Sequence, residues 1–363
     1  MLNRDPADYQ TLHEFVHSAR GKLDQNIWDY LIGGASTETT VRRNRLALDR
    51  IALRPRVLRN VSQVDARQPF LGHDLRLPLA FSPVGSLDSF HPHGAQEAVK
   101  AAAEFGIAAF SNALHRPGLE AIAAIGDGPR ILQCYAHGDR EWLVDVAQRA
   151  AAAGFDALCL TVDNAVGSRR ERDIAKRFVK PWGGEARQRG EISHVAALDW
   201  DDLHTLRQRV DLPIALKGIA TAEDARLAAE SGVDIVYVSN HGGRQLDHGR
   251  GSIDVLPEVV AAVQGRSRIV IDGGFSRGTD IVKAIALGAD LVSVGRLYCY
   301  ALAVGGAGAV VRLLQILESE VLEVLALLGV TRLNELNPAY LYLDAPVTQL
   351  PDVHSAFPLL NHY

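Results

Sequence analysis

The stretch RIVIDGGFSRGTDIVKAIALGADLVSVGR, residues 268–296, carries the repeating unit that decides the fold. An apolar run rich in branched residues ends in two glycines, a longer amphipathic segment follows, and a second apolar run ends in Gly295 and Arg296. The continuous apolar runs predict strands buried on both faces, and the amphipathic segment, with apolar residues about 3.6 positions apart, predicts a helix packed against them. The stretch therefore predicts one strand–helix–strand unit of a parallel sheet.

The same unit recurs along the chain after about residue 75. Eight apolar runs predict strands at 78–84, 107–113, 130–136, 157–163, 213–218, 235–240, 268–274 and 291–296. Intervening segments such as GAQEAVKAAAEFG (94–106) and TAEDARLAAESG (221–232) have helical spacing and end in glycine, as many helices do. Because eight such units close a barrel, we expect an α/β protein with a TIM (β/α)8 barrel, and an open doubly wound sheet is the alternative.

Three parts are expected along the chain. Residues 1–75 predict an N-terminal helical extension that caps the barrel, residues 76–335 the barrel itself, and residues 336–363 a C-terminal tail. The interval between the fourth and fifth strands is the longest and contains KPWGGEARQRGE (180–191), which predicts a loop or lid. VGGAGAV (304–310) follows no strand, so we interpret it as a helix interruption rather than a nucleotide-binding loop.

Composition narrows the possible function classes. The chain has 363 residues, is 47% hydrophobic and carries a net charge of −5 with both signs mixed, which is not the pattern of a nucleic-acid-binding protein. Three cysteines at unrelated spacings predict buried thiols in a reducing, cytoplasmic compartment. No apolar run has the length of a signal or membrane segment, so we expect a soluble protein without a membrane partner.

Polar residues or glycines end every expected strand, and in a TIM barrel these carboxyl ends carry the chemistry. They include Ser82, Gly85, Ser111, Asn112, Gln133, Tyr135, Thr161, Asp163, Lys217, Ser239 to Arg244, Asp272 to Gly274, Gly295 and Arg296. Glycine N–H groups and a guanidinium after the seventh and eighth strands suit a phosphate dianion. The alternative is that these glycines only make tight turns.

HPHG (91–94) predicts a turn before a helix, and we expect no metal there because no third ligand is suitably spaced.

The loop after the sixth strand, VSNHGGRQLD (238–247), has the most explicit chemistry. His241 can accept a proton near neutral pH, and Arg244 can bind a carboxylate through two N–H groups. Gly242 and Gly243 would let the backbone approach a flat ligand closely. A structural histidine is the alternative.

A second polar stretch, TVDNAVGSRRERD (161–173), follows the fourth strand. It places Asp163 at the strand end and Arg169 and Arg170 shortly after it. Because strand ends of a barrel meet at one face, this stretch can contribute to the same site as the histidine loop. The alternative is a solvated, charged helix start.

Several motifs together resemble one family. LTVDNAVGSRRERD, LKG, SNHGGRQLD, DGGFSRGTDIVKAIALGA and VGR are similar to motifs of the FMN-dependent 2-hydroxy acid oxidases and dehydrogenases, which include glycolate oxidase, lactate oxidase and mandelate dehydrogenase. The resemblance runs from about residue 9 to about residue 335. It implies a TIM barrel that holds FMN and oxidises a small L-2-hydroxy acid to the 2-oxo acid, with dioxygen or another carrier as electron acceptor. It also implies a homotetramer.

The resemblance implies roles for individual residues. His241 matches the active-site base and Asp163 the carboxylate that orients it, while Arg170 and Arg244 match the pair that holds the substrate carboxylate. Tyr30 and Tyr135 match hydroxyl contacts to the substrate. The residues that match flavin contacts are Pro83, Val84, Gly85, Ser111, Gln133, Thr161, Lys217, Ser239, Asp272, Gly273, Gly274, Arg277, Gly295 and Arg296.

Four positions depart from the family pattern or bear on the choice among its members. Ser276 stands where many members have a phosphate-side arginine, so either Arg277 replaces it or the contact is lost. Ala113 replaces the tryptophan of glycolate oxidases, and AVGSRRERD resembles mandelate-type members, which together imply a bulky or aromatic 2-hydroxy acid. Gly85 leaves space beside the flavin, so oxidase, dehydrogenase and monooxygenase outcomes stay open, as do hydride and carbanion mechanisms.

Three other hypotheses compete with this reading. An FMN enzyme of this fold could act on an amine or a modified peptide. A barrel that binds phosphate could instead be a non-redox aldolase or isomerase. A binding module is the last alternative, and the presence of His241, both arginines and Lys217 argues against it.

Overall fold

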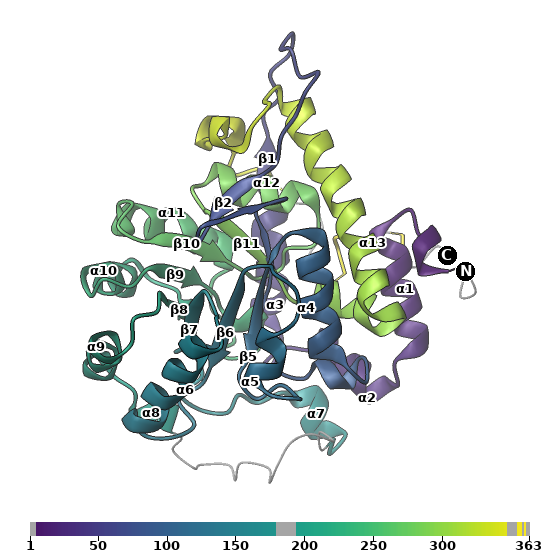
Figure 1. The fold of residues 1–363 in the computed structure, drawn as a ribbon. Coiled ribbons are helices and arrows are strands. Elements are labelled where there is room, and N and C mark those ends of the chain that lie inside the picture. Colours follow the sequence, from purple (N-terminus) through teal and green to yellow (C-terminus); the bar gives the residue numbers. More distant parts are fainter. Residues whose placement is uncertain (1–4, 179–193, 347–353, 358, 361–363) are drawn as a thin grey trace.

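The structure is a computed structural model that describes residues 5–178, 194–346, 354–357 and 359–360. Eight parallel strands form a closed barrel in the order β10-β11-β4-β5-β6-β7-β8-β9 (Figure 1). The strands are Leu79–Phe81 (β4), Ala108–Asn112 (β5), Arg130–Cys134 (β6), Ala157–Thr161 (β7), Ile214–Ile219 (β8), Ile235–Val238 (β9), Arg268–Ile271 (β10) and Leu291–Val294 (β11). The TIM barrel is therefore confirmed, and the open sheet is wrong because β11 pairs in parallel with β4.

Helices surround the barrel, as the amphipathic segments predict (Figure 1). Their bounds are Gly94–Phe105 (α4), Leu119–Ala123 (α5), Arg140–Ala152 (α6), Glu171–Ala175 (α7), His194–Ala197 (α8), Trp200–Arg209 (α9), Ala222–Glu230 (α10), Ser252–Val263 (α11), Gly278–Ala286 (α12) and Arg296–Leu328 (α13). Gly106 ends α4 at φ +89°, the left-handed conformation that glycine adopts most readily. KPWGGEARQRGE lies outside the described residues.

Helix α13 is the long helix that packs along the side of the barrel, against α1 and α4 (Figure 1). Its backbone departs from helical geometry at Gly305 and Gly306, so the predicted interruption is confirmed. By length and composition α13 could span a membrane, but 72% of its most apolar window is buried inside the molecule. Its apolar residues therefore belong to the protein core.

The N-terminal extension contains helices Leu12–Lys22 (α1), Gln25–Ile32 (α2) and Thr39–Asp49 (α3). Short strands follow: Ala52–Leu53 (β1) pairs with Leu341–Tyr342 (β12), and Gln68–Phe70 (β2) pairs with His73–Leu75 (β3). Single 3-10 turns are Pro6–Asp8 (η1), Leu87–Ser89 (η2), His241–Gly243 (η3), Leu333–Glu335 (η4) and Pro338–Tyr340 (η5). The extension thus contains short strands as well as helices, and the β1–β12 pair joins it to the C-terminal part. The three-part division and the homotetramer stay predictions.

A buried ion pair fixes α3 against α12. The guanidinium of Arg45 donates two hydrogen bonds of 2.8 Å to the carboxylate of Asp280, and the backbone N–H groups of Ser276 and Arg277 donate to the same carboxylate. Asp280 is fully buried. Removing the Asp280 charge would leave the buried Arg45 guanidinium with Asp49, 2.7 Å away, as its remaining carboxylate partner.

We expect Asp280→Asn to lower the free energy of unfolding by about 3–5 kcal/mol, the usual cost of breaking a buried pair. Urea unfolding with FMN in excess measures this change. Asp65→Asn is the control, because the Arg67 side chain that it pairs with is 62% exposed, so stability should hardly change. Equal losses in both variants would contradict the expectation.

Candidate active site

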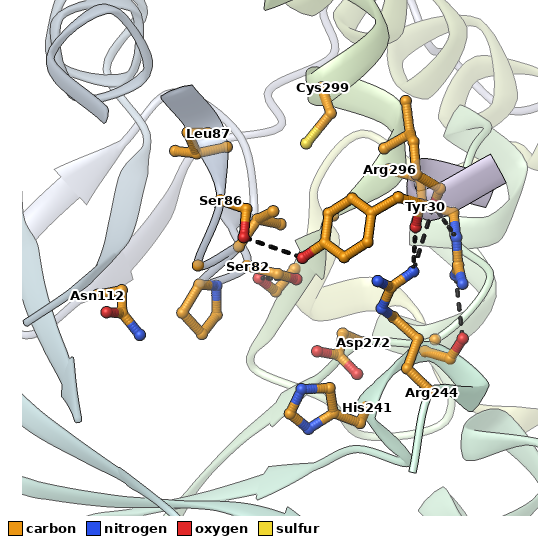
Figure 2. A pocket seen from close by; sticks show the side chains of 18 of the residues that line it. Tyr30, Ser82, Ser86, Leu87, Asn112, His241, Arg244, Asp272, Arg296 and Cys299 are labelled. Carbon is orange, nitrogen blue, oxygen red and sulfur yellow. Dashed lines mark hydrogen bonds between the residues drawn. The ribbon is translucent and has the colours of Figure 1, made fainter. Parts of the chain in front are cut away.

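One cavity of about 540 Å³ opens at the carboxyl ends of the barrel strands. Helices α2 and α3 contribute to its wall from the N-terminal extension, and Figure 2 shows Tyr30, His241, Arg244 and Asp272 around it. The sequence-predicted residues that line it are Tyr30, Ser82, Pro83, Val84, Gly85, Asn112, Tyr135, Arg170, Lys217, His241, Gly242, Arg244, Asp272, Gly273, Gly274, Gly295 and Arg296. Residues from all eight strand ends and from α2 thus converge on a single site.

Five predicted residues lie at the strand ends without lining the cavity: Ser111, Gln133, Thr161, Asp163 and Ser239. The Asp163 side chain is 13% exposed, and the other four residues are buried. The Gln133 side chain accepts a 2.6 Å hydrogen bond from the Asn112 amide and donates a 2.9 Å bond to the Thr161 hydroxyl. These hydrogen bonds connect polar side chains of three neighbouring strand ends into a layer beside the cavity.

His241 and Asp163 meet across the barrel. The His241 Nδ1 lies 3.0 Å from Asp163 Oδ1. We assign the ring proton to Nδ1, which donates it to this carboxylate, so Nε2 is the nitrogen that can accept a proton. Gly218 makes room for the carboxylate, because a Cβ there would lie 2.6 Å from the Asp163 Cβ. Burial lowers the pKa of His241 below its usual value, against the raising effect of Asp163, and Lys217 lowers it further. The imidazole is therefore neutral and able to accept a proton at neutral pH.

The backbone that presents His241 is unusual. His241, Gly242 and Gly243 have φ values of +58°, +62° and +74°, so three successive residues occupy the left-handed region. A histidine there is uncommon, and it is held by a 3.0 Å hydrogen bond from its N–H to the Ser239 hydroxyl. A Cβ at Gly243 would lie 2.7 Å from Val41 of α3. The glycines therefore permit both the turn and close contact with the N-terminal extension.

Lys217 is a buried cation at the end of β8. Its Nζ donates a 3.0 Å hydrogen bond to the Ser239 hydroxyl and lies 3.6 Å from the Asp272 carboxylate. Burial alone would lower the pKa of Lys217, but Asp272 and Asp163 outweigh it and raise the pKa. Lys217 consequently stays charged within the wall of the cavity.

The carboxyl end of α2 holds two arginines. Arg244 Nη1 donates to the carbonyls of Tyr30 and Gly33 at 2.7 and 2.9 Å, and the Arg296 guanidinium donates to Leu31 and Gly33 at 3.1 and 2.9 Å. The last carbonyls of a helix lack partners within the helix and carry partial negative charge, so they attract cations. Burial lowers the pKa of both arginines, and the nearby Arg170 adds to this effect. The site therefore has uncompensated positive charge that an anion would neutralise.

Two tyrosine hydroxyls reach the same cavity. The Tyr30 hydroxyl donates to Ser86 Oγ at 3.0 Å (Figure 2), and the Arg244 guanidinium lies 4.8 Å from the centre of the Tyr30 ring. Tyr135 stacks beside His241 with ring centres 6.5 Å apart. Burial raises the pKa of Tyr135 to about 12, so its hydroxyl stays protonated and can donate a hydrogen bond.

The glycine-lined end of the cavity lies after β10 and β11. Gly273 and Gly274 have φ values of +110° and +87°, and a Cβ at Gly273 would lie 2.5 Å from the Ser252 hydroxyl. Ser276 lines this end, but the structure does not bring Arg277 to it. Arg277, the residue that precedes α12, instead pairs with Glu320 of α13 at 2.6 Å. The hypothesis that Arg277 replaces the missing arginine is thus unsupported.

Sequence reasoning missed several lining residues. They are Val41, Asn44, Arg45, Ser86, Leu87, Asp88, Phe90, Leu114, His115, Arg116, His137, Cys299, Tyr300 and Phe357. Phe357 comes from the C-terminal part, and Asn44 exchanges hydrogen bonds of 3.0 and 2.7 Å with Asn240. Asn44 and Arg45 begin NRLALDRIALRPRVL (44–58), a stretch that also resembles the family, and this resemblance could have identified them. HPHG forms the predicted turn before α4, and the described residues contain no cluster of three or more metal-ligating side chains.

Comparisons with known proteins agree with this geometry. The family model for FMN-dependent dehydrogenase matches residues 19–343. The chain is 39% identical over 359 residues to L-lactate oxidase of Nostoc sp., covering 92% of this chain and 98% of the relative. It is 37% identical over 352 residues to glycolate oxidase of Spinacia oleracea, covering 92% and 95%. A crystal structure of mandelate oxidase with benzoyl-formic acid matches with a TM-score of 0.86 and 37% identity, covering 93% of this chain and all of that chain.

Proposed function

Since this chain belongs to the family of FMN-dependent dehydrogenases, we propose that it oxidises an L-2-hydroxy acid with a bulky or aromatic side chain to the 2-oxo acid. Family membership makes it an oxidoreductase that uses FMN and acts on the CH–OH group of 2-hydroxy acids. One observation carries the proposal. A single cavity joins His241, Arg170 and Arg244 to the glycine-lined end after β10 and β11.

The residues present fit FMN. Gly273, Gly274 and Gly295 offer an uncrowded backbone beside Arg296, a buried cation with a lowered pKa that an anionic phosphate would stabilise. Lys217 adds a fixed positive charge in the floor of the cavity, where negative charge develops when a flavin is reduced. We therefore assign the phosphate to the glycine-lined end and the flavin ring to the Lys217 side.

The chain's own residues then bind the substrate and transfer its proton. Arg170 and Arg244 bind the substrate carboxylate, and Tyr135 donates a hydrogen bond to the bound acid. His241 Nε2 accepts a proton as the hydroxy acid is oxidised, and Asp163 stabilises the imidazolium that forms. FMN, when bound, accepts the two electrons that the substrate loses.

The wall beside the strand ends supports a bulky substrate. Asn112 and Leu114 line the cavity whereas the small Ala113 between them does not, and Leu87 and Phe90 add apolar surface. Apolar and aromatic lining favours an apolar side chain on the ligand. The similarity to mandelate oxidase structures is a further support.

Anaerobic bleaching of the flavin tests the substrate class. We expect (S)-mandelate to bleach the bound FMN faster than L-lactate or glycolate at equal concentration, because only mandelate fills the apolar wall. Readmission of air then reports whether dioxygen is an efficient acceptor. Faster bleaching by the small acids would overturn the bulky-substrate proposal, and bleaching by amines alone would favour the amine hypothesis.

The pH dependence of flavin reduction follows from His241. Its pKa is lowered from the usual value of 6.5, so the neutral base predominates above that lowered pKa. We expect kcat/KM to rise with pH through a pKa below 6.5 and then level off. In Asp163→Asn the group that raises the His241 pKa is lost, so the rise in kcat/KM should occur at lower pH and the rate of flavin reduction should fall. A rise that moves to higher pH in this variant would contradict the assignment of His241 as the base.

A further inference from the structure

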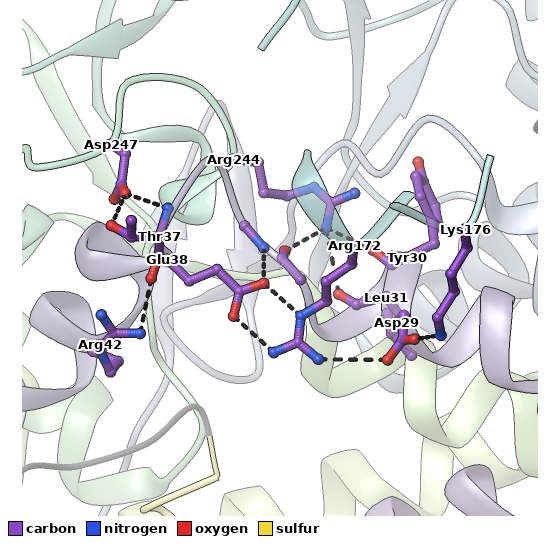
Figure 3. Close-up of polar contacts among 12 residues, drawn as sticks. Asp29, Tyr30, Leu31, Thr37, Glu38, Arg42, Arg172, Lys176, Arg244 and Asp247 are labelled. Atoms are coloured by element: carbon purple, nitrogen blue, oxygen red, sulfur yellow. Dashed lines mark hydrogen bonds and ion pairs between the residues drawn. The ribbon is translucent and has the colours of Figure 1, made fainter. Parts of the chain in front are cut away.

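An ion network attaches α7 to the N-terminal extension (Figure 3). The Arg172 guanidinium binds both carboxylate oxygens of Glu38, at 2.5 and 2.7 Å, and its Nη1 lies 3.4 Å from Asp29. Lys176, one turn further along, donates to the other oxygen of Asp29. Helix α7 is thus attached to α2 and to the residue preceding α3 by two cations and two carboxylates.

The carboxylates are the buried half of this network. The side chains of Asp29 and Glu38 are 9% and 13% exposed, whereas those of Arg172 and Lys176 are about one-third exposed. Burial raises the pKa of Glu38, but the hydrogen bonds from Arg172 outweigh this, so the carboxylate stays ionised. A buried carboxylate needs its cation, which makes this contact stronger than an exposed ion pair.

Arg170 lies between two attachment points. On one side the Ser36 N–H donates a 2.7 Å hydrogen bond to the Arg169 carbonyl, and on the other side Arg172 binds Glu38. Arg170 itself is the residue that precedes α7, and its guanidinium lies 5.9 Å from the centre of the Tyr30 ring. Among the described residues, Arg170 forms no ion pair with an acidic side chain. Its position therefore depends on its neighbours in the chain.

The same short segment also holds the second arginine of the site. The carbonyls of Tyr30 and Gly33 accept from Arg244, and Gly34 N–H donates to Glu38 at 3.1 Å. One segment, residues 29–38, is therefore in contact with Arg244 directly and with the neighbours of Arg170.

We propose that Arg172 is a positioning residue that fixes Arg170 for binding of the substrate carboxylate, through its contacts with Glu38 and Asp29. The inference rests on the proposed function of Arg170. Arg172 touches neither substrate nor cofactor. It acts by holding the start of α7 on the segment that also holds Arg244, so that both arginines meet one carboxylate.

Binding of benzoylformate to the oxidised holoenzyme, followed by the change in flavin absorbance, is the test. We expect Arg172→Ala to weaken binding about tenfold, because a misplaced cation loses the orientation that makes a bidentate clamp effective. The flavin reduction rate at saturating mandelate should change less than KM. Arg169→Ala is the matched control, since that side chain is 61% exposed and its one ion pair among the described residues is with Glu171 at 3.7 Å, and it should bind as the wild type does.

A double-mutant cycle separates positioning from general stability. In an Arg170→Ala background, Arg172→Ala should weaken binding no further, because its effect passes through Arg170. Arg172→Lys, which keeps one charge, should be intermediate between Arg172→Ala and the wild type. Unchanged binding in Arg172→Ala, or an equal loss with and without Arg170, overturns this inference alone. If the wild type binds no 2-oxo acid and no 2-hydroxy acid bleaches it, the proposed function fails, and the role of Arg172 with it.

Discussion

His241→Ala is expected to retain bound FMN and to reduce it with substrate about 10²–10⁴ times more slowly than the wild type, the usual contribution of a positioned general base. His241 combines a basic Nε2 with a carboxylate partner on its other ring nitrogen, since Asp163 lies 3.0 Å from Nδ1. The cofactor should stay because the glycine-lined end, Arg296 and Lys217 are unchanged. Alanine also has a Cβ, so the left-handed backbone at residue 241 is not relieved in this variant.

Stopped-flow bleaching under anaerobic conditions measures this loss, and the flavin absorbance of the purified variant measures retention of FMN. His248→Ala is the matched control, because it removes an exposed histidine from the same loop, with 65% of its side chain in solvent. Its reduction rate should equal that of the wild type. If His241→Ala holds its FMN and still reduces it at a wild-type rate, another group is the base.

The barrel and the central pair of the site could be predicted because each has a local signal. Strands such as Arg268–Ile271 and Leu291–Val294 are continuous apolar runs that end in glycine, and barrel geometry places all carboxyl ends at one face. His241 and Asp163 could therefore be expected to meet although 78 residues separate them. Their shared position at the carboxyl ends of strands was sufficient to predict this contact.

Contacts between the N-terminal extension and the barrel could not be predicted in this way. Arg244 donates to the carbonyl of Tyr30, 214 residues away, and a backbone carbonyl leaves no mark in the sequence. The two-residue strands β1 and β12 are too short for an alternating pattern, so they escaped notice. For Arg277, a position next to Ser276 in the chain suggested a phosphate contact, but the structure pairs this arginine with Glu320 instead.

Arg244→Met should raise the Kd for benzoylformate and the KM for mandelate by about 10²–10⁴, because two charge-assisted hydrogen bonds, each worth about 1.5–3 kcal/mol, are lost together. The large effect is expected because the Arg244 guanidinium binds the carbonyls of α2 with one nitrogen and leaves its other N–H groups for the substrate. Its Nη1 is occupied by the carbonyls of Tyr30 and Gly33 at 2.7 and 2.9 Å, which anchors the group at the carboxyl end of α2. The remaining N–H groups can then face a carboxylate in a fixed orientation.

Arg244→Lys separates charge from geometry. A lysine keeps the positive charge but has a single ammonium group, which cannot bind the α2 carbonyls and a carboxylate in the same planar arrangement. We expect it to recover part of the affinity that Arg244→Met loses, with KM still well above that of the wild type. Arg250→Met is the matched control, because that arginine follows the same loop and pairs with Glu258 at the surface, away from the cavity lining. Wild-type KM in Arg244→Met would remove Arg244 from the carboxylate clamp, whereas full activity in Arg244→Lys would reduce its role to charge alone.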